Sequence, residues 1–228
     1  MSDIAKNIKT VYGRIERAAE KSGRKHQDIT LVAVSKTFPA EYIIEAAEHG
    51  ITDIGENRVQ ETLAKYELIG NRVKWHLVGH LQTNKVRKTV GVFDLIHSVE
   101  SVHLAEEINK RNNNPQKILV EVNTTEEESK FGVGVNDAVN FVREISELPN
   151  IAVMGLMTIG VFSADPEESR GYFITLRELK EKIEQYDLGK GEMKYLSMGM
   201  SNDFETAIEE GANIVRVGTA IFGSRHGY

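Results

Sequence analysis

The sequence of 228 residues contains no cysteine, which excludes disulfide bonds, thiolate metal sites and a cysteine nucleophile. This absence also favours the reducing cytoplasm as the compartment. No apolar run approaches the roughly 18 residues that a membrane span needs, and the first ten residues, MSDIAKNIKT, lack the apolar segment of a secretory signal. An excess of positive charge is absent as well, because 28 basic residues stand against 34 acidic ones and the formal net charge is −6. We therefore expect neither a membrane nor nucleic acid as a partner.

What the sequence does contain is an ordinary globular composition, with 40% hydrophobic and 27% charged residues. A chain of 228 residues fits two small domains or one large one, and α/β barrels of about 250 residues are of this size. We find no stretch long enough, or biased enough in composition, to serve as a linker. Residues 1–228 are therefore predicted to form a single domain.

Apolar and β-branched runs alternate with helical patterns along the chain. The predicted strands span residues 30–36, 52–57, 73–80, 95–99, 117–123, 152–159, 195–200 and 214–221. The first five begin about every 22 residues, a strand–helix repeat that indicates parallel strands joined by right-handed crossovers. Before them, Ile4, Ile8, Val11 and Ile15 follow a period of about 3.6 and predict an additional amphipathic helix.

These strand–helix units predict an α/β fold, a single (β/α)8 TIM-type barrel with an extra N-terminal helix. The competing architecture is an open doubly wound sheet, which usually has fewer strands and a glycine-rich turn after the first one. In this sequence the corresponding turn is SKTFPAE, which contains no glycine. The barrel is therefore the predicted fold.

Lys36 ends the first predicted strand, whose sequence TLVAVSK is otherwise almost wholly apolar. Such a strand is buried on both faces of a parallel sheet, and barrels carry their functional side chains at the carboxyl ends of the strands. Desolvation lowers the pKa of a lysine from about 10.4, and a neutral amine can condense with an aldehyde to form a Schiff base. The alternative is that Lys36 only marks the solvent end of the strand.

Two segments near the end of the chain predict an anion site. Ser201 and Asn202 follow the seventh predicted strand at the expected start of a helix, whose free N–H groups favour an anion. Gly218 and Thr219 lie at the end of the eighth, and barrels commonly hold phosphate with these two loops. The alternative is that the first pair only caps the helix and that Gly218 forms a tight turn.

Other polar residues near the strand ends leave alternatives open. Arg216, inside the apolar run IVRVGTAIF, needs either a carboxylate partner or a ligand acceptor. Asn57 could donate to a ligand oxygen near Lys36 or could be an ordinary turn residue. His76 and His80 do not predict a metal site, because four residues of a strand span about 13 Å.

Several segments match a known family, and they are VSKTFP, GENRVQE, WHLVGHLQTNK, IHSVES, ESKFG, GLMTIG, SMGMSNDFETAI and VRVGTAIFG. In this order they closely resemble the pyridoxal phosphate homeostasis protein family, which is related to the barrel domain of alanine racemase. The match covers essentially the whole chain. It implies a fold-type III barrel with pyridoxal 5′-phosphate (PLP) as its cofactor.

The resemblance also implies roles for individual residues. Lys36 is implied to be the Schiff-base lysine, Asn57 to lie beside the cofactor ring, and Arg216 to face the pyridine nitrogen. The residues implied to hold the phosphate are Ser201, Gly218 and Thr219, and those implied to line the rest of the site are Ser197 and Met200.

The function implied by the resemblance is PLP binding in intracellular vitamin B6 homeostasis, without strong catalysis, so that the protein is not an enzyme. An arginine at the ring nitrogen fits this role, because a guanidinium disfavours the proton that makes the ring an electron sink. The implied partners are PLP and PLP-dependent apo-enzymes, and the protein is expected to be a monomer. The alternative is a Schiff-base-forming barrel enzyme, either similar to an amino-acid racemase or a cofactor-free class I aldolase.

We expect no appreciable alanine racemase activity. Racemisation needs acid–base groups on both faces of the substrate carbon, and Lys36 serves only one face. In the racemase to which the resemblance points, the opposing tyrosine comes from a carboxyl-terminal β domain. This chain is expected to lack that domain, because it ends at Tyr228, a few residues after the last predicted strand.

Overall fold

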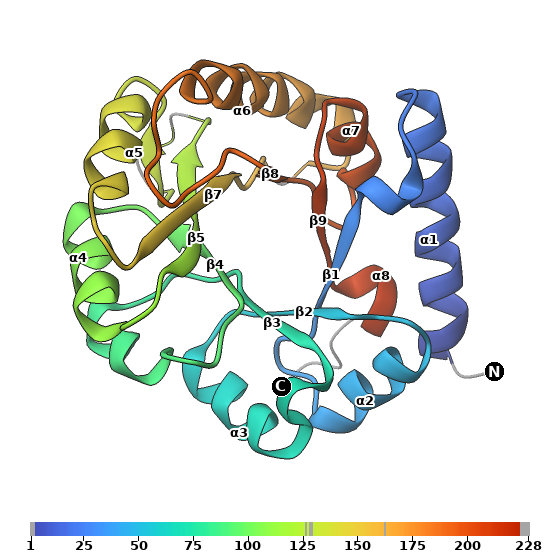
Figure 1. Ribbon diagram of the computed structural model, residues 1–228. Helices are drawn as coiled ribbons and strands as arrows, with labels where there is room; N and C mark the ends of the chain where they lie inside the picture. Colours follow the sequence, from blue (N-terminus) through green and yellow to red (C-terminus); the bar gives the residue numbers. More distant parts are fainter. Residues whose placement is uncertain (1–2, 126, 128–129, 162, 224–228) are drawn as a thin grey trace.

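The computed structural model describes residues 3–125, 127, 130–161 and 163–223. Its strands form one parallel sheet in the order β4-β3-β2-β1-β9-β8-β7-β5-β6, and an additional pairing between β4 and β5 closes the sheet into a barrel (Figure 1). The strands are β1 Thr30–Val34, β2 Asp53–Glu56, β3 Lys74–Leu77, β4 Leu95–Val99, β5 Gln116–Asn123, β6 Val133–Gly134, β7 Ile151–Met157, β8 Tyr195–Ser197 and β9 Ile214–Val217. The predicted barrel is thereby confirmed, with β6 as an extra short strand that pairs only with β5.

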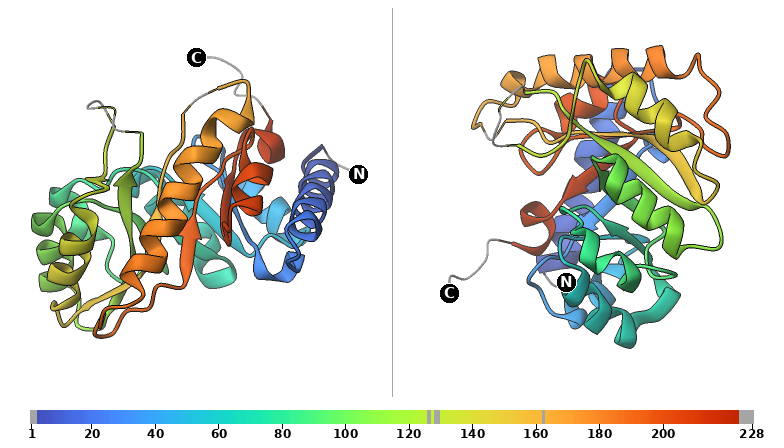
Figure 2. Two further views of the ribbon diagram at one scale, coloured as in Figure 1. Left: turned by 90° about the horizontal axis from the view of Figure 1, so that it is seen from above. Right: turned by 90° about the vertical axis from the view of Figure 1, so that its left-hand side faces the viewer.

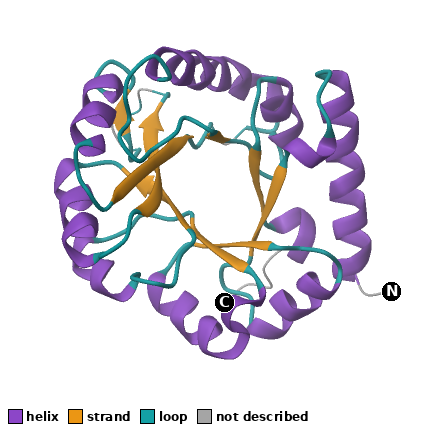
Figure 3. Cartoon of the chain, viewed as in Figure 1, coloured by secondary structure: helices purple, strands orange, loops and turns teal. Residues whose placement is uncertain are grey.

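Helices form a layer around the barrel, as the view along its axis shows (Figure 3). The α-helices are α1 Asp3–Lys21, α2 Ala40–Glu48, α3 Val59–Ile69, α4 Val102–Arg111, α5 Ala138–Ser146, α6 Arg170–Ile183, α7 Phe204–Glu209 and α8 Thr219–Phe222. The 3-10 helices are His26–Asp28, Gly70–Arg72, Thr83–Lys88 and Pro166–Ser169. Side views show the longer helices running alongside the strands (Figure 2). None of the helices in the described ranges is long and apolar enough to cross a membrane.

The predicted N-terminal helix is α1, and its apolar stripe is buried as the periodicity requires. It packs against α7 and α8, the last helices of the described chain. Polar bonds add to this packing: the Asn7 amide donates to the carbonyl of Ile221 at 3.0 Å, and Arg14 pairs with Glu205 at 2.6 Å. The helix therefore covers the side of the barrel where the first and last strands, β1 and β9, pair.

Successive strand residues alternate between the interior of the barrel and the helical layer. In β1, Leu31 and Ala33 belong to the large core shared with the helices, whereas Val32 and Val34 belong to a smaller cluster inside the barrel. The other buried members of the inner cluster are Val78, Leu95, Leu119, Met157 and Ile214. Continuing this alternation past the end of β1 directs Ser35 outward and Lys36 inward.

Some element ends differ from the prediction. The last strand ends at Val217, and the apolar residues after it form α8 instead of continuing the strand to residue 221. Ile221 and Phe222 are buried in both interpretations, and a short apolar run cannot by itself distinguish a strand from a buried helix. Helix α7 begins at Phe204 and not at Asn202, because residues 201–203 form a turn. Tyr228, on which the expected chain end rests, lies outside the described residues.

Candidate functional site

A cavity of about 470 Å³ opens where the strands end, and it is lined by residues that follow β1, β2, β3, β7, β8 and β9. This is the size of an ordinary small-molecule site, and the carboxyl ends of barrel strands are where such sites occur. The predicted site residues found in its lining are Lys36, Asn57, Met200, Ser201, Arg216, Gly218 and Thr219. Ser197 is not among them, because it is fully buried, and its hydroxyl accepts a hydrogen bond from Arg216. Their roles as PLP ligands stay predictions.

Lys36 reaches the cavity from a strained turn. The next residue, Thr37, has a φ of 68°, which lies in the left-handed region that β-branched residues rarely adopt. Such a conformation costs about 1–2 kcal/mol, so surrounding contacts must impose it. One of them is the hydrogen bond from the Thr37 N–H to the Glu61 carboxylate, at 3.3 Å. The chain leaves β1 through this turn, and Lys36 lines the cavity.

A buried ionic cluster on the outer side of the barrel supports this turn. Glu56 is fully buried, and one of its oxygens accepts hydrogen bonds from the Ser35 hydroxyl at 2.6 Å and from Lys65 Nζ at 2.5 Å. Lys65 also donates to the Ser35 carbonyl at 2.9 Å. Burial raises the pKa of Glu56, and the nearby Lys65 opposes this shift. The cluster ties the ends of β1 and β2 to α3, directly beside Lys36 and Asn57.

The expected anion site consists mainly of hydroxyl groups. The Thr219 hydroxyl lies 3.1 Å from that of Ser201, which also accepts the Ala220 N–H at 3.4 Å. Gly218 lets the backbone lie close to β1, since a Cβ there would be 3.1 Å from the Val34 carbonyl oxygen. The two loops predicted to hold an anion are therefore joined at this point.

The interpretation of Ser201 and Asn202 as helix caps does not hold. Asp203 occupies the N-cap position of α7, and its carboxylate accepts the Met200 N–H at 2.6 Å. The Ser201 side chain instead reaches across to α8.

Arg216 brings a cation to the wall of the cavity. It is only 5% exposed, and it donates to the Ser197 hydroxyl at 2.7 Å and to the Thr158 carbonyl at 2.8 Å. Burial lowers its pKa to about 10, against the opposing effect of Glu121 and Asp203. The guanidinium therefore keeps its charge at neutral pH. No carboxylate among the described residues forms an ion pair with it, so the carboxylate partner considered as an alternative is not a direct one.

Glu121, on β5, was not predicted from the sequence. It is 5% exposed, and burial together with Glu100 raises its pKa to about 7, although Arg216 acts in the opposite direction. The position in an apolar strand, KILVEVN, is the signal that could have identified it. A carboxyl group with such a pKa changes charge near neutral pH, close to the cavity arginine.

We expect Glu121→Gln to raise the free energy of unfolding at pH 8 by about 3 to 4 kcal/mol and to change it little at pH 4. The folded state binds this proton with a pKa of about 7, and the unfolded chain with a pKa of about 4.3. Stability is therefore lost as the pH rises from about 4 to about 7 in the wild type, and glutamine removes that loss. Urea unfolding at both pH values measures the effect. Glu106→Gln, on the exposed outer face of α4, is the control, and a loss of stability at pH 8 in Glu121→Gln would contradict the assignment.

The fold and the cavity define a class of protein, the (β/α)8 barrels built like the N-terminal domain of alanine racemase. The family model of that domain matches residues 7–226. Within this class, the chain belongs to the pyridoxal phosphate homeostasis protein family. It is 45% identical to the family member of Aquifex aeolicus over 98% of this chain and 99% of the relative, and 36% identical to that of Escherichia coli K12 over 99% and 98%.

Solved structures agree with this assignment. PipY of Synechococcus elongatus, solved with PLP bound, is 34% identical and superposes with a TM-score of 0.79 over 92% of this chain and all of PipY, 100%. Alanine racemase of Corynebacterium glutamicum superposes with a TM-score of 0.76 over 99% of this chain and 62% of the racemase, at 16% identity. The second likeness supports the fold alone.

Proposed function

We propose that this protein binds PLP in the cavity and takes part in intracellular PLP homeostasis. The observation that carries the proposal is the meeting of three groups in one cavity: the Lys36 amine, the Arg216 guanidinium, and the paired hydroxyls of Ser201 and Thr219. The PLP-bound structure of the relative PipY supports it.

The donor set of the cavity fits this cofactor. When bound, PLP supplies an aldehyde that can form a covalent bond with a lysine amine. Lys36 would provide that amine, and the hydroxyls of Ser201 and Thr219, with the backbone at Gly218, would hold the phosphate. Arg216 would lie at the ring nitrogen, with Asn57 and Met200 beside the ring.

The cavity is better suited to holding PLP than to catalysis. Arg216 is a buried cation, and a cation near the ring nitrogen disfavours its protonation and so limits the ring as an electron sink. We propose a monomeric carrier that supplies PLP to apo-enzymes. The test is the visible spectrum of the purified protein, followed by transfer of PLP to an apo-enzyme. A colourless protein that takes up no added PLP would contradict the proposal and favour a cofactor-free aldolase.

We expect Ser201→Ala and Thr219→Val to weaken PLP binding more than pyridoxal binding. Only PLP carries the phosphate, and a lost hydrogen bond to a charged group costs about 1.5–3 kcal/mol, or roughly 10- to 150-fold in affinity. Binding titrations with both ligands measure the difference. Thr175→Val, on the outer helix α6, is a matched control and should change neither affinity. Equal losses for the two ligands would place the phosphate elsewhere.

The likeness to alanine racemase suggests amino-acid racemisation as an alternative function. Racemisation needs acid–base groups on both faces of the substrate carbon, and among the described residues the titratable ones lining the cavity are Lys36, Asp203 and Arg216. Asp203 is held by the Met200 N–H, and an arginine is a poor base. We expect no deuterium exchange at Cα of L- or D-alanine with the PLP-loaded protein in heavy water. Racemisation with exchange at an enzyme-like rate would establish the alternative.

A further inference from the structure

A line of hydrogen bonds leads from the cavity arginine across the interior of the barrel. Arg216 Nη1 lies 2.7 Å from Ser197 Oγ, and Ser197 Oγ lies 2.9 Å from His97 Nδ1. His97 Nε2 lies 2.9 Å from His76 Nδ1, and His76 Nε2 lies 2.9 Å from Asp53 Oδ1. We call these five residues the Arg216–Asp53 relay. It passes from β9 through β8, β4 and β3 to β2.

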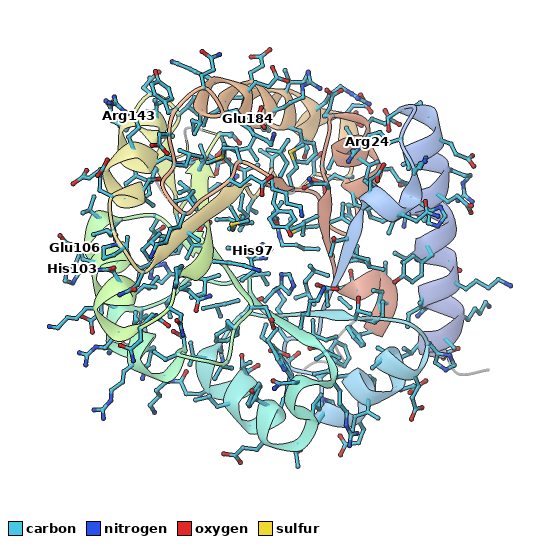
Figure 4. The ribbon with its side chains drawn as sticks, in the orientation of Figure 1. Arg24, His97, His103, Glu106, Arg143 and Glu184 are labelled. Carbon is cyan, nitrogen blue, oxygen red and sulfur yellow. The ribbon has the colours of Figure 1, made fainter. Side chains whose placement is uncertain are left out.

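All five side chains are buried, with residue exposures between 0% and 6%. Figure 4 shows His97 inside the ring of strands, whereas His103 and Glu106, on α4, lie on the outside of the molecule. Barrel interiors are normally filled by branched apolar side chains, and a buried polar group stabilises a fold less than an apolar one of the same shape. Packing and stability alone therefore do not explain five hydrogen-bonded polar side chains at these positions.

The direction of the hydrogen bonds follows from the chemistry of the two ends. Arginine can only donate, so Ser197 Oγ accepts from Arg216. At the other end, burial favours a raised pKa for Asp53, but hydrogen bonds from His76 and Thr52 outweigh it and hold the pKa below its usual value. Asp53 is therefore an ionised acceptor at neutral pH, and His76 Nε2 must donate to it.

The hydrogen bond between the two imidazoles then has one direction when each ring carries a single proton. Burial, His76 and Arg216 together lower the pKa of His97 well below its usual range, so His97 carries one proton. That proton is on Nε2 and is donated to His76 Nδ1, while the Ser197 hydroxyl donates to His97 Nδ1. Arg216, Ser197, His97 and His76 each donate toward Asp53, and each of these bonds is accepted by the next member of the relay. The reverse direction would require a second proton on His76.

The common direction of these hydrogen bonds affects the charge at the Arg216 end of the relay. Arg216 has no directly paired carboxylate among the described residues, and Glu121 and Asp203 act on its charge without an ion pair. The relay adds dipoles whose negative ends face the guanidinium. We propose that His97, His76 and Asp53 are positioning residues for the cavity, which act through Ser197 to fix the Arg216 guanidinium and to add to the negative potential that Glu121 and Asp203 provide. The inference rests on the proposed function, because the fixed cation is what the ring of bound PLP would meet.

The first test needs no ligand. Nitrogen-15 NMR of the histidine rings in the PLP-free protein should show His97 and His76 as neutral tautomers with the proton on Nε2 and none on Nδ1. A proton on Nδ1 of His97 would reverse the relay and overturn the proposal. This result is independent of whether the protein binds PLP at all.

The second test uses Asp53→Asn, which keeps an acceptor oxygen for His76 but removes the charge. We expect PLP affinity to fall about 5- to 20-fold, with a shift in the absorbance maximum of bound PLP. Ser98→Ala is the matched control, because Ser98 is a fully buried neighbour of His97 whose hydroxyl bonds to the Gly79 carbonyl, away from the relay. The control should lose stability without changing the spectrum.

A double-mutant cycle separates positioning from a merely structural role. If Asp53 acts through Arg216, then Asp53→Asn should have almost no effect on PLP affinity or spectrum in an Arg216→Gln background. An undiminished effect in that background, or an Asp53→Asn variant that behaves like Ser98→Ala, would overturn the relay. Failure of the wild-type protein to bind PLP would instead refute the proposed function, and the NMR measurement would still decide the direction of the relay.

Discussion

Replacing Lys36 with alanine should abolish the visible absorbance band of covalently bound PLP, with little change in the stability of the fold. The lysine follows β1 and lies only partly buried at the cavity, so its loss would remove the proposed covalent bond to the aldehyde without opening the core. Weak binding through the hydroxyls of Ser201 and Thr219 should remain.

Spectra and equilibrium dialysis with PLP measure the two effects of Lys36→Ala separately. Lys74→Ala, at the exposed start of β3, changes a lysine at the opposite end of a strand and should leave the band intact. A band that persists in Lys36→Ala would mean that another lysine forms the bond. The orientation inferred from the alternation along β1 would then be wrong.

Lys65→Met should produce the largest loss of stability, about 3–5 kcal/mol, because it leaves the fully buried Glu56 without its counter-charge. This is a large share of the roughly 5–15 kcal/mol that stabilises a typical domain. The other oxygen of Glu56 has no hydrogen-bond partner in the described structure, so only the hydrogen bond from the Ser35 hydroxyl would remain to stabilise the charge. Urea unfolding at pH 8 measures the loss.

The stability of Lys65→Met should depend on pH in a definite direction. Burial already raises the pKa of Glu56 in the folded protein, and removal of Lys65 raises it further. A carboxyl with a raised folded pKa destabilises the fold as the pH rises, so Lys65→Met should regain stability toward pH 5. The double variant Glu56→Gln/Lys65→Met removes the charge and should recover much of the loss at pH 8. If it were as unstable as Lys65→Met, lost packing and not the charge would be the cause.

The barrel itself could be predicted because its signal is local and repeated. The strand at 95–99 lies at its predicted bounds, and the spacing of the apolar runs gave the parallel order. The end of the last strand could not be predicted, since the apolar residues after Val217 satisfy burial equally well in α8.

The location of the cavity could be predicted from the sequence for a similar reason, because Lys36 and Arg216 interrupt apolar runs near strand ends. The Arg216–Asp53 relay could not be predicted. His76 and His97 lie on different strands, and their contact depends on the register between β3 and β4, which no local pattern specifies. The left-handed conformation of Thr37 escaped prediction as well, because threonine at that position carries no signal for it.

The packing of α1 against α7 and α8 has a consequence for the order of folding. Asn7 and Ile221 are bonded although 214 positions separate them, and the cavity likewise combines Lys36 and Asn57 with the segment from Met200 to Thr219. During synthesis, Lys36 leaves the ribosome long before Ser201, Arg216 and Thr219 have been added to the chain. Contacts of such long range form late and slowly, so the proposed cofactor site is complete only once synthesis has passed α8. The cavity that we propose for PLP therefore forms only when the first and last parts of the barrel have come together.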